Sequence, residues 1–372
     1  MARRCVVVAF GTRPEAIKLA PVIRRLRERD VLDVRVLVTG QHREMLDQVL
    51  RLFDIAPDAD LDVMLPRQLL DQLTCRVLSG IAPVLDELAP DAVIVQGDTT
   101  TTFVAALAAF YRGVPVAHVE AGLRTGTPDC PFPEEMNRRL TTRLATWHFA
   151  ATIGAQANLL AEGVSADSIS LTGNTVIDAL FEALEVPFVF PPGRLADALA
   201  GDMRIVLVTA HRRENWGEPI RDICRALRRL VEVNEDIVIV FSVHKNPVVR
   251  EAVDTALRGV ERVMLLDPLE YLPFVHLMEA STLVLSDSGG MQEEAPSLGK
   301  PVLVLRQDTE RPEAVECGVA KVVGTDPERI FTEASSLLGD AAAYCQMARA
   351  SNPFGDGHAA ERIAGVLESR LS

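Results

Sequence analysis

The stretch STLVLSDSGGMQEEAPSLGKPVLVLRQDTERPEA, residues 281–314, predicts a strand, a turn, a helix and a second strand in that order. The apolar run at 283–285 is typical of a buried strand, and it ends in a polar turn at 286–290 that contains two adjacent glycines. A helical pattern starts at Met291, and the apolar run at 301–305 predicts the second strand. Strands that alternate with helices in this way are typical of a parallel sheet covered by helices.

The turn of this stretch has the features of an anion-binding site. Gly289 and Gly290 let a ligand approach the backbone closely, and the free N–H groups of the first helical turn favour an anion. Glu294 lies about one turn into the helix, where it can bond a ribose hydroxyl. Charged residues follow the second strand to the same edge of the sheet: Arg306, Glu310 and Arg311. We predict a nucleotide diphosphate site; the alternative is an ordinary turn in which Ser288 caps the helix.

The length and composition favour a globular protein of about two domains. The chain has 372 residues, of which 48% are hydrophobic and 24% are charged, and this length provides full cores for roughly two domains. The formal net charge of -14 argues against a broad nucleic-acid surface, because binding a phosphate backbone requires a basic face. We therefore expect no nucleic-acid partner, although a local basic pocket for an anionic ligand is compatible with this charge.

The cysteines and the N-terminal sequence indicate a cytoplasmic, soluble protein. The apolar run at 6–10 is too short for a signal peptide, and no apolar run approaches the roughly 18 residues of a membrane span. The cysteines form no CxxC pair and no cluster with histidines at zinc spacing, so we expect reduced thiols and no metal site. They are Cys5, Cys75, Cys130, Cys224, Cys317 and Cys345.

The beginning of the chain resembles a Rossmann-type unit without its cofactor motif. A strand is expected at 5–10, followed by the turn 11–15 and a helix from about Ala16. The GxGxxG motif is missing, so the sequence does not support an NAD or FAD cofactor. Arg13 in the turn and Lys18 in the helix are instead available for an anionic ligand, although Lys18 could simply be a solvated helix residue.

Two halves of similar size each alternate strands with helices. We predict an α/β fold of two Rossmann-like, doubly wound parallel sheets, with the first domain at 1–175 and the second at 176–355. Three prolines mark the boundary region at 186–203. The polar clusters of both halves fall where strands end, which is the edge at which open α/β sheets bind ligands, so we expect the site in a cleft between the domains.

Three carboxylates and one histidine are the candidates for acid–base chemistry. Each lies at the end of a predicted strand or at the start of a helix, and the set is Asp98, Glu120, Glu134 and His211. Arg13, His244 and Arg311 are candidates for stabilising charge. Each of three candidates has a structural alternative: Asp98 could cap a helix, Glu134 could serve the helix dipole, and His211 could be a hydrogen-bonded core histidine.

Long motifs give the chain a family resemblance. In order they are GTRPEAIKLAP (11–21), TGQHREML (39–46), GDTTTT (97–102), HVEAGLRT (118–125), PFPEEMNR (131–138), TGNTVIDAL (172–180), AHRREN (210–215), SVHKNP (242–247), DPLEYLPF (267–274), SDSGGMQEEAPSLGKPVLVLR (286–306) and TERPEA (309–314). Together they resemble the non-hydrolysing bacterial UDP-N-acetylglucosamine 2-epimerases over nearly the whole chain.

The resemblance implies the two-domain fold of the B-type glycosyltransferases, with the C-terminal helix (356–372) packing back on the first domain. It implies interconversion of UDP-GlcNAc and UDP-ManNAc through 2-acetamidoglucal, with no cofactor and no metal. The catalytic roles fall on Asp98, Glu120, Glu134 and His211. The contacts to UDP or sugar fall on Arg13, Lys18, Phe274, Ser288, Gly289, Gly290, Glu294 and Arg311. One departure is Leu269, where some relatives carry Gln.

The resemblance also implies a homodimer and, in some members, activation by a second UDP-GlcNAc. The residues implied for that second site are Gln41, His42, Arg212 and His244. Three alternatives stay open from the sequence: a hydrolysing epimerase that releases ManNAc and UDP, a B-type glycosyltransferase that uses an acceptor, and a non-catalytic sensor of nucleotide sugars. The sensor is disfavoured because all the expected carboxylates are present.

Overall fold

The computed structural model describes residues 3–40, 43–65 and 67–372. The chain divides into two compact units, the first made of Met1–Glu182 with Phe354–Ser372 and the second of Ala183–Pro353. The division falls inside helix α7 (Thr175–Glu185), a few residues after the 175/176 boundary expected from the sequence.

Unit 1 is built on a parallel sheet. Its described residues form seven strands in the order β3-β2-β1-β4-β5-β6-β7, and all the pairs are parallel. The strands are β1 (Arg4–Phe10), β2 (Leu32–Val38), β3 (Ala59–Asp60), β4 (Ala92–Gln96), β5 (Val116–Ala121), β6 (Trp147–Ala150) and β7 (Ile169–Leu171). The central strands are buried on both faces, which explains why they read as continuous apolar runs instead of alternating ones.

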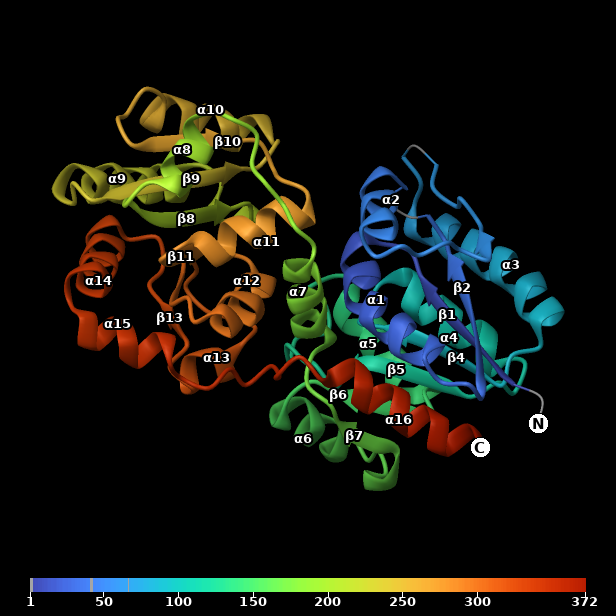
Figure 1. Cartoon of the computed structure of the whole chain (residues 1–372). Helices are drawn as coiled ribbons and strands as arrows, with labels where there is room; N and C mark the ends of the chain where they lie inside the picture. Colours follow the sequence, from blue (N-terminus) through green and yellow to red (C-terminus); the bar gives the residue numbers. More distant parts are fainter. Residues whose placement is uncertain (1–2, 41–42, 66) are drawn as a thin grey trace. The chain divides into compact units, whose positions relative to one another are not determined.

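Helices cover both faces of this sheet (Figure 1). They are α1 (Arg13–Arg27), α2 (Arg43–Leu52), α3 (Leu70–Leu88), α4 (Thr100–Phe110), α5 (Glu134–Leu144), α6 (Ile153–Ala161), the 3₁₀ turn η1 (Ala166–Ser168), α7 and α16 (Ala359–Leu371). α1 packs against α2 and α16, and α4 packs against α3 and α5. The apolar side chains of α3 and α4 meet those of β1 and β4 in one buried cluster that includes Val7, Val77, Val93 and Val104.

The C-terminal helix α16 belongs to unit 1 although most of unit 2 precedes it in the chain. The Asp178 carboxylate accepts hydrogen bonds from the N–H groups of Ala359 (3.2 Å) and Ala360 (2.9 Å), so it occupies the N-terminus of α16. Further along the helix, Glu361 and Glu368 form ion pairs with Arg29 just after α1. Helix α16 is therefore anchored to the rest of unit 1 through its N-terminus and through side-chain ion pairs.

Unit 2 repeats the architecture. Its sheet has six parallel strands among the described residues, in the order β10-β9-β8-β11-β12-β13. The strands are β8 (Arg204–Ala210), β9 (Ile237–Val243), β10 (Val263–Leu266), β11 (Leu283–Ser286), β12 (Val302–Val304) and β13 (Ala320–Val322). The prediction of two doubly wound parallel sheets is confirmed.

The helices of unit 2 follow the strands in the same alternation. They are α8 (Arg194–Ala200), η2 (Arg213–Asn215), α9 (Glu218–Val233), α10 (Pro247–Leu257), α11 (Tyr271–Ala280), α12 (Gly289–Glu294), η3 (Ala295–Leu298), α13 (Pro312–Glu316), α14 (Pro327–Gly339) and α15 (Ala341–Ala348). α9 packs against α10 and α14, and Leu227 and Leu230 of α9 join the buried cluster beneath.

In each sheet the strand order reverses direction between two neighbouring strands. Chain connections run outward in opposite directions from β1 and β4 in unit 1, and from β8 and β11 in unit 2. Open α/β sheets bind ligands at the carboxyl ends of the strands at such a switch point. A ligand is therefore expected at the turns after β1 and β4, and at those after β8 and β11.

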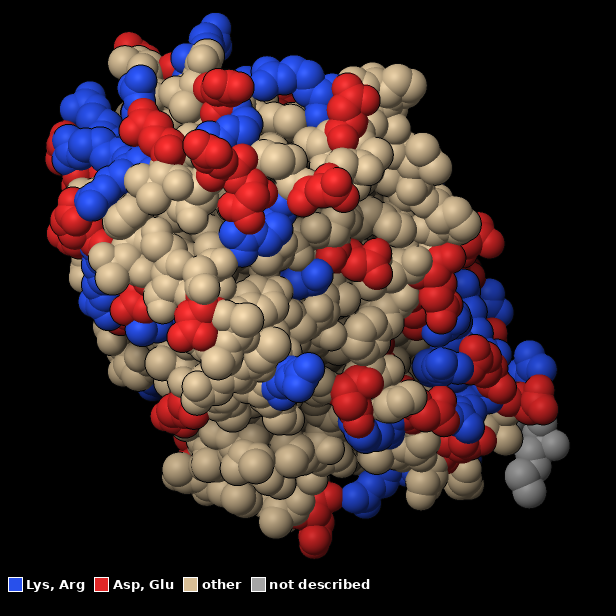
Figure 2. All heavy atoms as spheres, turned by 60° about the vertical axis from the view of Figure 1, so that its left-hand side comes forward, with Lys and Arg blue, Asp and Glu red and all other residues tan. Residues whose placement is uncertain are grey.

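The surface carries mixed charge, and no described helix is long and apolar enough to cross a membrane. On the face drawn in Figure 2, basic and acidic side chains are interspersed. Helix α9 illustrates the pattern, because Arg221 and Arg225 both pair with Glu218. Exposed pairs of this kind contribute about 0–1 kcal/mol each, so they add little to the stability of the fold.

Candidate functional site

Asp98 follows β4 and is paired with an arginine. Its carboxylate forms an ion pair with Arg138 of α5, and its carbonyl oxygen accepts a hydrogen bond from Asn137 Nδ2 at 2.9 Å. The alternative that Asp98 caps a helix is wrong, because Thr99 occupies the N-cap of α4 and its hydroxyl accepts from Thr102 N at 3.1 Å. Asp98 is therefore held by Arg138 and Asn137, and its side chain does not cap α4.

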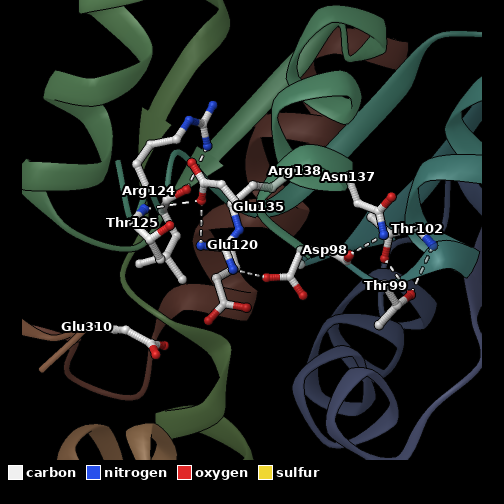
Figure 3. A network of polar contacts seen from close by, with 12 residues as sticks. Asp98, Thr99, Thr102, Glu120, Arg124, Thr125, Glu135, Asn137, Arg138 and Glu310 are labelled. Atoms are coloured by element: carbon white, nitrogen blue, oxygen red, sulfur yellow. Dashed lines mark hydrogen bonds and ion pairs between the residues drawn. The ribbon is translucent and has the colours of Figure 1, made fainter. Parts of the chain in front are cut away.

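The environment of Asp98 changes its acidity. Burial raises the pKa of the Asp98 carboxyl, Arg138 lowers it, and the negative charge of Glu120 raises it again, with a net rise above the ordinary value. In Figure 3 the Arg138 guanidinium lies between the carboxylates of Asp98 and Glu135. A carboxyl whose pKa is raised, next to a second carboxylate, is a candidate for proton transfer.

Glu120 lies inside β5, at a point where the strand is irregular. The register of β5 against β6 shifts between Val119 and Ala121, and Glu120 has a φ of +62°. A positive φ is costly for a residue with a side chain, by about 1–3 kcal/mol, and such conformations cluster at functional sites. The bulge rotates this carboxylate out of the strand's regular alternation.

The Glu120 carboxylate is surrounded by donors. Lys18 Nζ lies 2.6 Å from Oε1, Asn174 Nδ2 donates to the same oxygen at 3.0 Å, and Gln96 Nε2 donates to Oε2. The alternative that Lys18 is a solvated helix residue is wrong, because its side chain is only 16% exposed. Within unit 1, Lys18 thus stabilises the charge of a carboxylate that follows it by 102 residues.

The adjacent glutamates at the start of α5 have different surroundings. Glu135 is fully buried, and its carboxylate accepts from Arg139 Nε at 2.8 Å and from the N–H of Thr125 at 3.1 Å. Glu134 is the first residue of α5 and half-buried, and no hydrogen bond or ion pair of its side chain occurs among the described residues. Glu135 therefore holds the 125–133 loop, whereas Glu134 is the glutamate left for a ligand.

Glu15 is a positioning residue that the sequence analysis did not single out. It is 1% exposed, and it accepts hydrogen bonds from the N–H groups of Gly11 (3.0 Å) and Thr12 (2.8 Å). It also accepts from the hydroxyls of Thr99 at 2.7 Å and Thr102 at 3.1 Å. Burial raises the pKa of the Glu15 carboxyl, although these hydrogen bonds oppose the rise. The T-x-x-E spacing of a capping box was the signal available in the sequence.

These contacts connect the ends of neighbouring strands in unit 1. Glu15 ties the turn after β1 to the first turn of α4, directly beside Asp98. Arg13, the predicted anion contact, is the first residue of α1 at the same end of β1. Because β1, β4 and β5 are neighbours in the sheet, the fold gathers Asp98 and Glu120 at one edge. The two carboxylates therefore form one cluster at the carboxyl edge of the sheet.

In unit 2 the turn after β11 leads into α12, and its glycines are not required by the backbone. Ser288 occupies the N-cap of α12, but its side chain makes no capping bond, so the capping alternative is wrong. A Cβ on Gly289 would lie 3.8 Å from the Arg311 guanidinium carbon and 4.0 Å from Arg212 Nη2. A Cβ on Gly290 would lie 3.4 Å from Glu294 Oε2. These are van der Waals distances, so the missing side chains leave space in front of two guanidinium groups.

Arg311 is held firmly beside Gly289. It is 9% exposed, its Nε forms an ion pair with Glu293, and its Nη1 donates to the carbonyl oxygen of Glu310 at 3.1 Å. Burial raises the pKa of the Glu310 carboxyl, but Arg212, Arg306 and Arg311 outweigh burial and lower it. Three arginines around one carboxylate place several guanidinium groups at this corner of unit 2, and guanidinium groups are suited to bind an anionic ligand.

Glu294 is placed as predicted, one turn into the region after the glycines. It is 9% exposed, and the Tyr271 hydroxyl donates to its Oε1 at 3.0 Å. Phe274 follows Tyr271 by three residues on α11, so both lie on the same side of that helix. Glu294 therefore lies at the turn that carries Gly289 and Gly290, because its Oε2 is the nearest atom that a Cβ on Gly290 would meet.

His211 follows β8 and faces a buried carboxylate. Its side chain is 41% exposed, so the alternative of a core histidine is wrong. Its Nδ1 lies 3.0 Å from Oδ1 of Asp287, which is 0% exposed. Burial raises the pKa of the Asp287 carboxyl, but hydrogen bonds from His211 and Arg212 outweigh burial and lower it. The sequence analysis named Asp287 only as part of a turn.

Of the residues implied for a second ligand site, two can be placed. Gln41 and His42 lie outside the described residues. Arg212 flanks Gly289, and its Nη1 lies 3.8 Å from Glu310. His244 is exposed, and its ring lies 6.2 Å from that of His211 in a stacked arrangement. Within the described residues, no group of His, Cys, Asp and Glu side chains could hold a metal ion.

The chain is similar to known proteins over nearly its whole length. The family model for UDP-N-acetylglucosamine 2-epimerase matches residues 24–368. The chain is 52% identical over 371 residues to the UDP-N-acetylglucosamine 2-epimerase of Escherichia coli K12, covering 98% of each protein. The crystal structure of UDP-GlcNAc 2-epimerase from Neisseria meningitidis bound to UDP-GlcNAc matches with a TM-score of 0.88 and 47% identity, covering 98% of this chain and 100% of that one. A glycotransferase of kitacinnamycin, at 14% identity and a TM-score of 0.66 with 100% of both chains covered, shares the fold.

Proposed function

This chain belongs to the UDP-N-acetylglucosamine 2-epimerase family, and on that premise we propose that it interconverts UDP-N-acetylglucosamine and UDP-N-acetylmannosamine. We propose the non-hydrolysing type, in which the sugar stays attached to UDP in substrate and product, and a role in supplying ManNAc units for surface polysaccharide. The observation that carries the proposal is the carboxylate cluster of unit 1, because inversion at carbon needs acid–base groups that binding alone does not.

The chemistry begins with departure of UDP. The proton on C2 of the sugar is not next to a carbonyl group, so no base removes it at a useful rate while the C1–O bond is intact. Breaking that bond gives C1 cationic character and makes the C2 proton acidic. The departing UDP is an anion and has to be stabilised by hydrogen-bond donors. Removing one donor of this kind typically lowers the rate about 10²–10³-fold. We assign this role to Arg311 and the N–H groups after Ser288, with Arg13 as a further contact.

A carboxylate next takes the C2 proton, which leaves 2-acetamidoglucal and UDP. Addition of UDP back to C1, with a proton delivered to the other face of C2, gives the epimer. Two faces require two acid–base groups, and we assign Asp98, Glu120 and Glu134 to this set together. Support comes from Asp98, whose pKa is raised, and from Glu134, whose side chain is half-buried and has no partner among the described residues.

Lys18 supports Glu120 in this proposal. The Lys18 ammonium 2.6 Å from Glu120 stabilises the ionised carboxylate, and the amide donors of Asn174 and Gln96 fix its orientation. The family resemblance implied that Lys18 contacts UDP or the sugar. Its contact with Glu120 supports a role in setting the charge of the carboxylate, which any sugar contact would share.

The test is an NMR experiment on the purified protein with UDP-GlcNAc in D₂O and no added cofactor. The proposal predicts a new anomeric signal of UDP-ManNAc, with deuterium at C2 of both epimers. Release of free ManNAc and UDP would assign the protein to the hydrolysing epimerases. A spectrum that changes only after an acceptor sugar is added would assign it to the glycosyltransferases.

We propose a homodimer, and activation by a second UDP-GlcNAc molecule bound near Arg212 and His244. Cooperative dependence of the initial rate on UDP-GlcNAc supports activation, and a hyperbolic dependence contradicts it. Sedimentation analysis of the purified chain decides the oligomeric state.

A further inference from the structure

Asp287 is a buried carboxylate at the switch point of the unit 2 sheet. It follows β11, and one of its oxygens, Oδ2, accepts three hydrogen bonds. The donors are the N–H groups of His211 and Arg212, both at 2.8 Å, and Asn215 Nδ2 at 2.9 Å. Three donors on one oxygen hold the carboxylate firmly and connect the end of β11 to the turn after β8.

The other oxygen of this carboxylate is directed at the His211 ring. Oδ1 lies 3.0 Å from His211 Nδ1, within ion-pair distance, and accepts no hydrogen bond among the residues that the structure describes. A fully buried carboxylate oxygen without a donor is costly, so the energetically favourable arrangement places a hydrogen on Nδ1. The hydrogen bond on one ring nitrogen of a histidine determines what the other nitrogen can do.

From this geometry we propose that Asp287 is a positioning residue that fixes His211 with its hydrogen on Nδ1. The ring then presents Nε2 on the side away from Asp287, and the side chain is 41% exposed, so Nε2 is the atom offered to a ligand. The inference rests on the proposed function for its role: Nε2 contacts the diphosphate of UDP as it leaves and returns. His244 is an ionisable side chain beside this ring, with 6.2 Å between the two ring centroids.

The charge of the site is consistent with this arrangement. The pKa of the Asp287 carboxyl is lowered because hydrogen bonds from His211 and Arg212 outweigh burial, so the group is anionic at neutral pH. Carboxylate and imidazole then form a pair in which the carboxylate orients the ring and does not itself exchange protons. The same division of roles is known for buried aspartates behind catalytic histidines in hydrolases.

The direct test measures the protonated nitrogen of His211 without using activity. Long-range ¹H–¹⁵N NMR of the ¹⁵N-labelled protein, with His211→Gln to assign the signals, reports which nitrogen carries hydrogen when the ring is neutral. We expect Nδ1–H in the wild type and a change toward Nε2–H in Asp287→Asn, because the amide of Asn can donate to Nδ1. Nε2–H in the wild type overturns the proposal whether or not the protein is an epimerase.

Kinetics then separate positioning from general stability. Asp287→Asn is expected to lower kcat by roughly 10²–10⁴-fold, the range of losses for misplaced acid–base groups. The matched control is Asn215→Ala, which removes one donor from Oδ2 and leaves Oδ1 facing His211. It should keep the wild-type tautomer and most of kcat. A comparable loss of kcat in both variants with the tautomer unchanged indicates a merely structural carboxylate and overturns the proposal.

A double-variant cycle completes the test. If Asp287 acts through His211, adding Asp287→Asn to His211→Gln lowers kcat no further, because the ring that it orients is already gone. If the two losses multiply, Asp287 acts independently and the proposal fails. Thermal unfolding of each variant with and without UDP identifies variants that do not fold.

Discussion

The carboxyl edges of the two sheets have opposite chemistry although the two units share one architecture. In unit 1 the edge gathers Asp98 and Glu120, each paired with one cation. In unit 2 the edge presents two guanidinium groups beside a glycine that carries no side chain. Parallel sheets with the same switch-point topology therefore set the position of a site, while its chemistry depends on which side chains the turns carry.

The difference extends to how charge is controlled. In unit 1, burial raises the pKa of Asp98, so its protonation is sensitive to the neighbouring arginine. In unit 2, arginines lower the pKa of Glu310 despite burial, so that carboxylate stays ionised and the local charge is constant. A proton-transfer site needs groups near their titration point, whereas an anion site needs fixed charge. Variants can test this contrast in order of expected effect.

The largest effect is expected for Glu120→Gln. The variant keeps the shape of the side chain but removes its charge, and we expect kcat to fall by about 10³-fold or more, since acid–base groups contribute about 10²–10⁴. UDP affinity, measured by calorimetry, should stay within a few fold because the guanidinium groups of unit 2 are untouched. Glu28→Gln at an exposed position is the matched control. Turnover of Glu120→Gln close to the wild-type value removes Glu120 from the mechanism.

The next largest effect is expected for Arg311→Met. Hydrogen bonds to charged groups contribute about 1.5–3 kcal/mol, which corresponds to a roughly 10–150-fold loss of UDP affinity by calorimetry. The exposed Arg221→Met is the control and should bind UDP normally.

Arg311→Met also removes the buried ion pair with Glu293, and breaking such a pair costs about 3–5 kcal/mol of stability. The double variant Arg311→Met/Glu293→Gln should recover part of the stability but not the affinity. If it recovers both, Arg311 is a structural residue and not an anion contact.

A smaller effect is expected for Gly289→Ala. Its Cβ fits the folded protein at ordinary contact distances, so the free energy of unfolding should be unchanged or higher by up to about 1 kcal/mol. UDP affinity should fall about tenfold, equivalent to roughly 1.4 kcal/mol, because the methyl group enters the space before the two guanidinium groups. Gly365→Ala in α16, where a Cβ meets nothing within 4 Å, is the control. Unchanged UDP affinity in Gly289→Ala argues against a diphosphate at this turn.

The smallest effect is a shift in pH dependence for Arg138→Gln. Arg138 lowers the pKa of Asp98 against the effect of burial, so its removal raises that pKa further. If ionised Asp98 is required, the acidic limb of kcat/KM moves to higher pH by roughly one unit, the lower end of the effect of a nearby opposite charge. Arg139→Gln, which contacts Glu135 but not Asp98, should leave the limb in place. An unmoved limb in Arg138→Gln means that another group controls it.

Several elements could be predicted closely from the sequence, and the errors have physical causes. The strands β1 and β11 lie within one residue of the runs predicted at 5–10 and 283–285. β5 contains a bulge at Glu120, which no apolar pattern marks. Helix α8 was not predicted, since the prolines at 186–203 suggested a linker.

The candidate site was likewise predicted in part from the sequence. The resemblance to the epimerase family is confirmed, and the residues that it implied stay predictions about function. The structure corrected four structural alternatives: Asp98 and Ser288 do not cap their helices through their side chains, His211 is not a core histidine, and Lys18 is not a solvated helix residue. Glu15 and Asp287 were overlooked because a buried carboxylate looks like any other acidic residue in a sequence.

The long motifs of the sequence indicated the family by resemblance. Its apolar periodicity and glycine-rich turns determined the two parallel sheets and the polar turns at the ends of their strands, because these are local signals. Only the tertiary structure decided the partners of each charged group. Lys18 meets Glu120 across 102 positions, Arg138 meets Asp98 across 40, and His211 faces a carboxylate in the turn after β11. Such pairs follow from strand order and side-chain packing, which bring distant residues together without leaving a pattern in the chain.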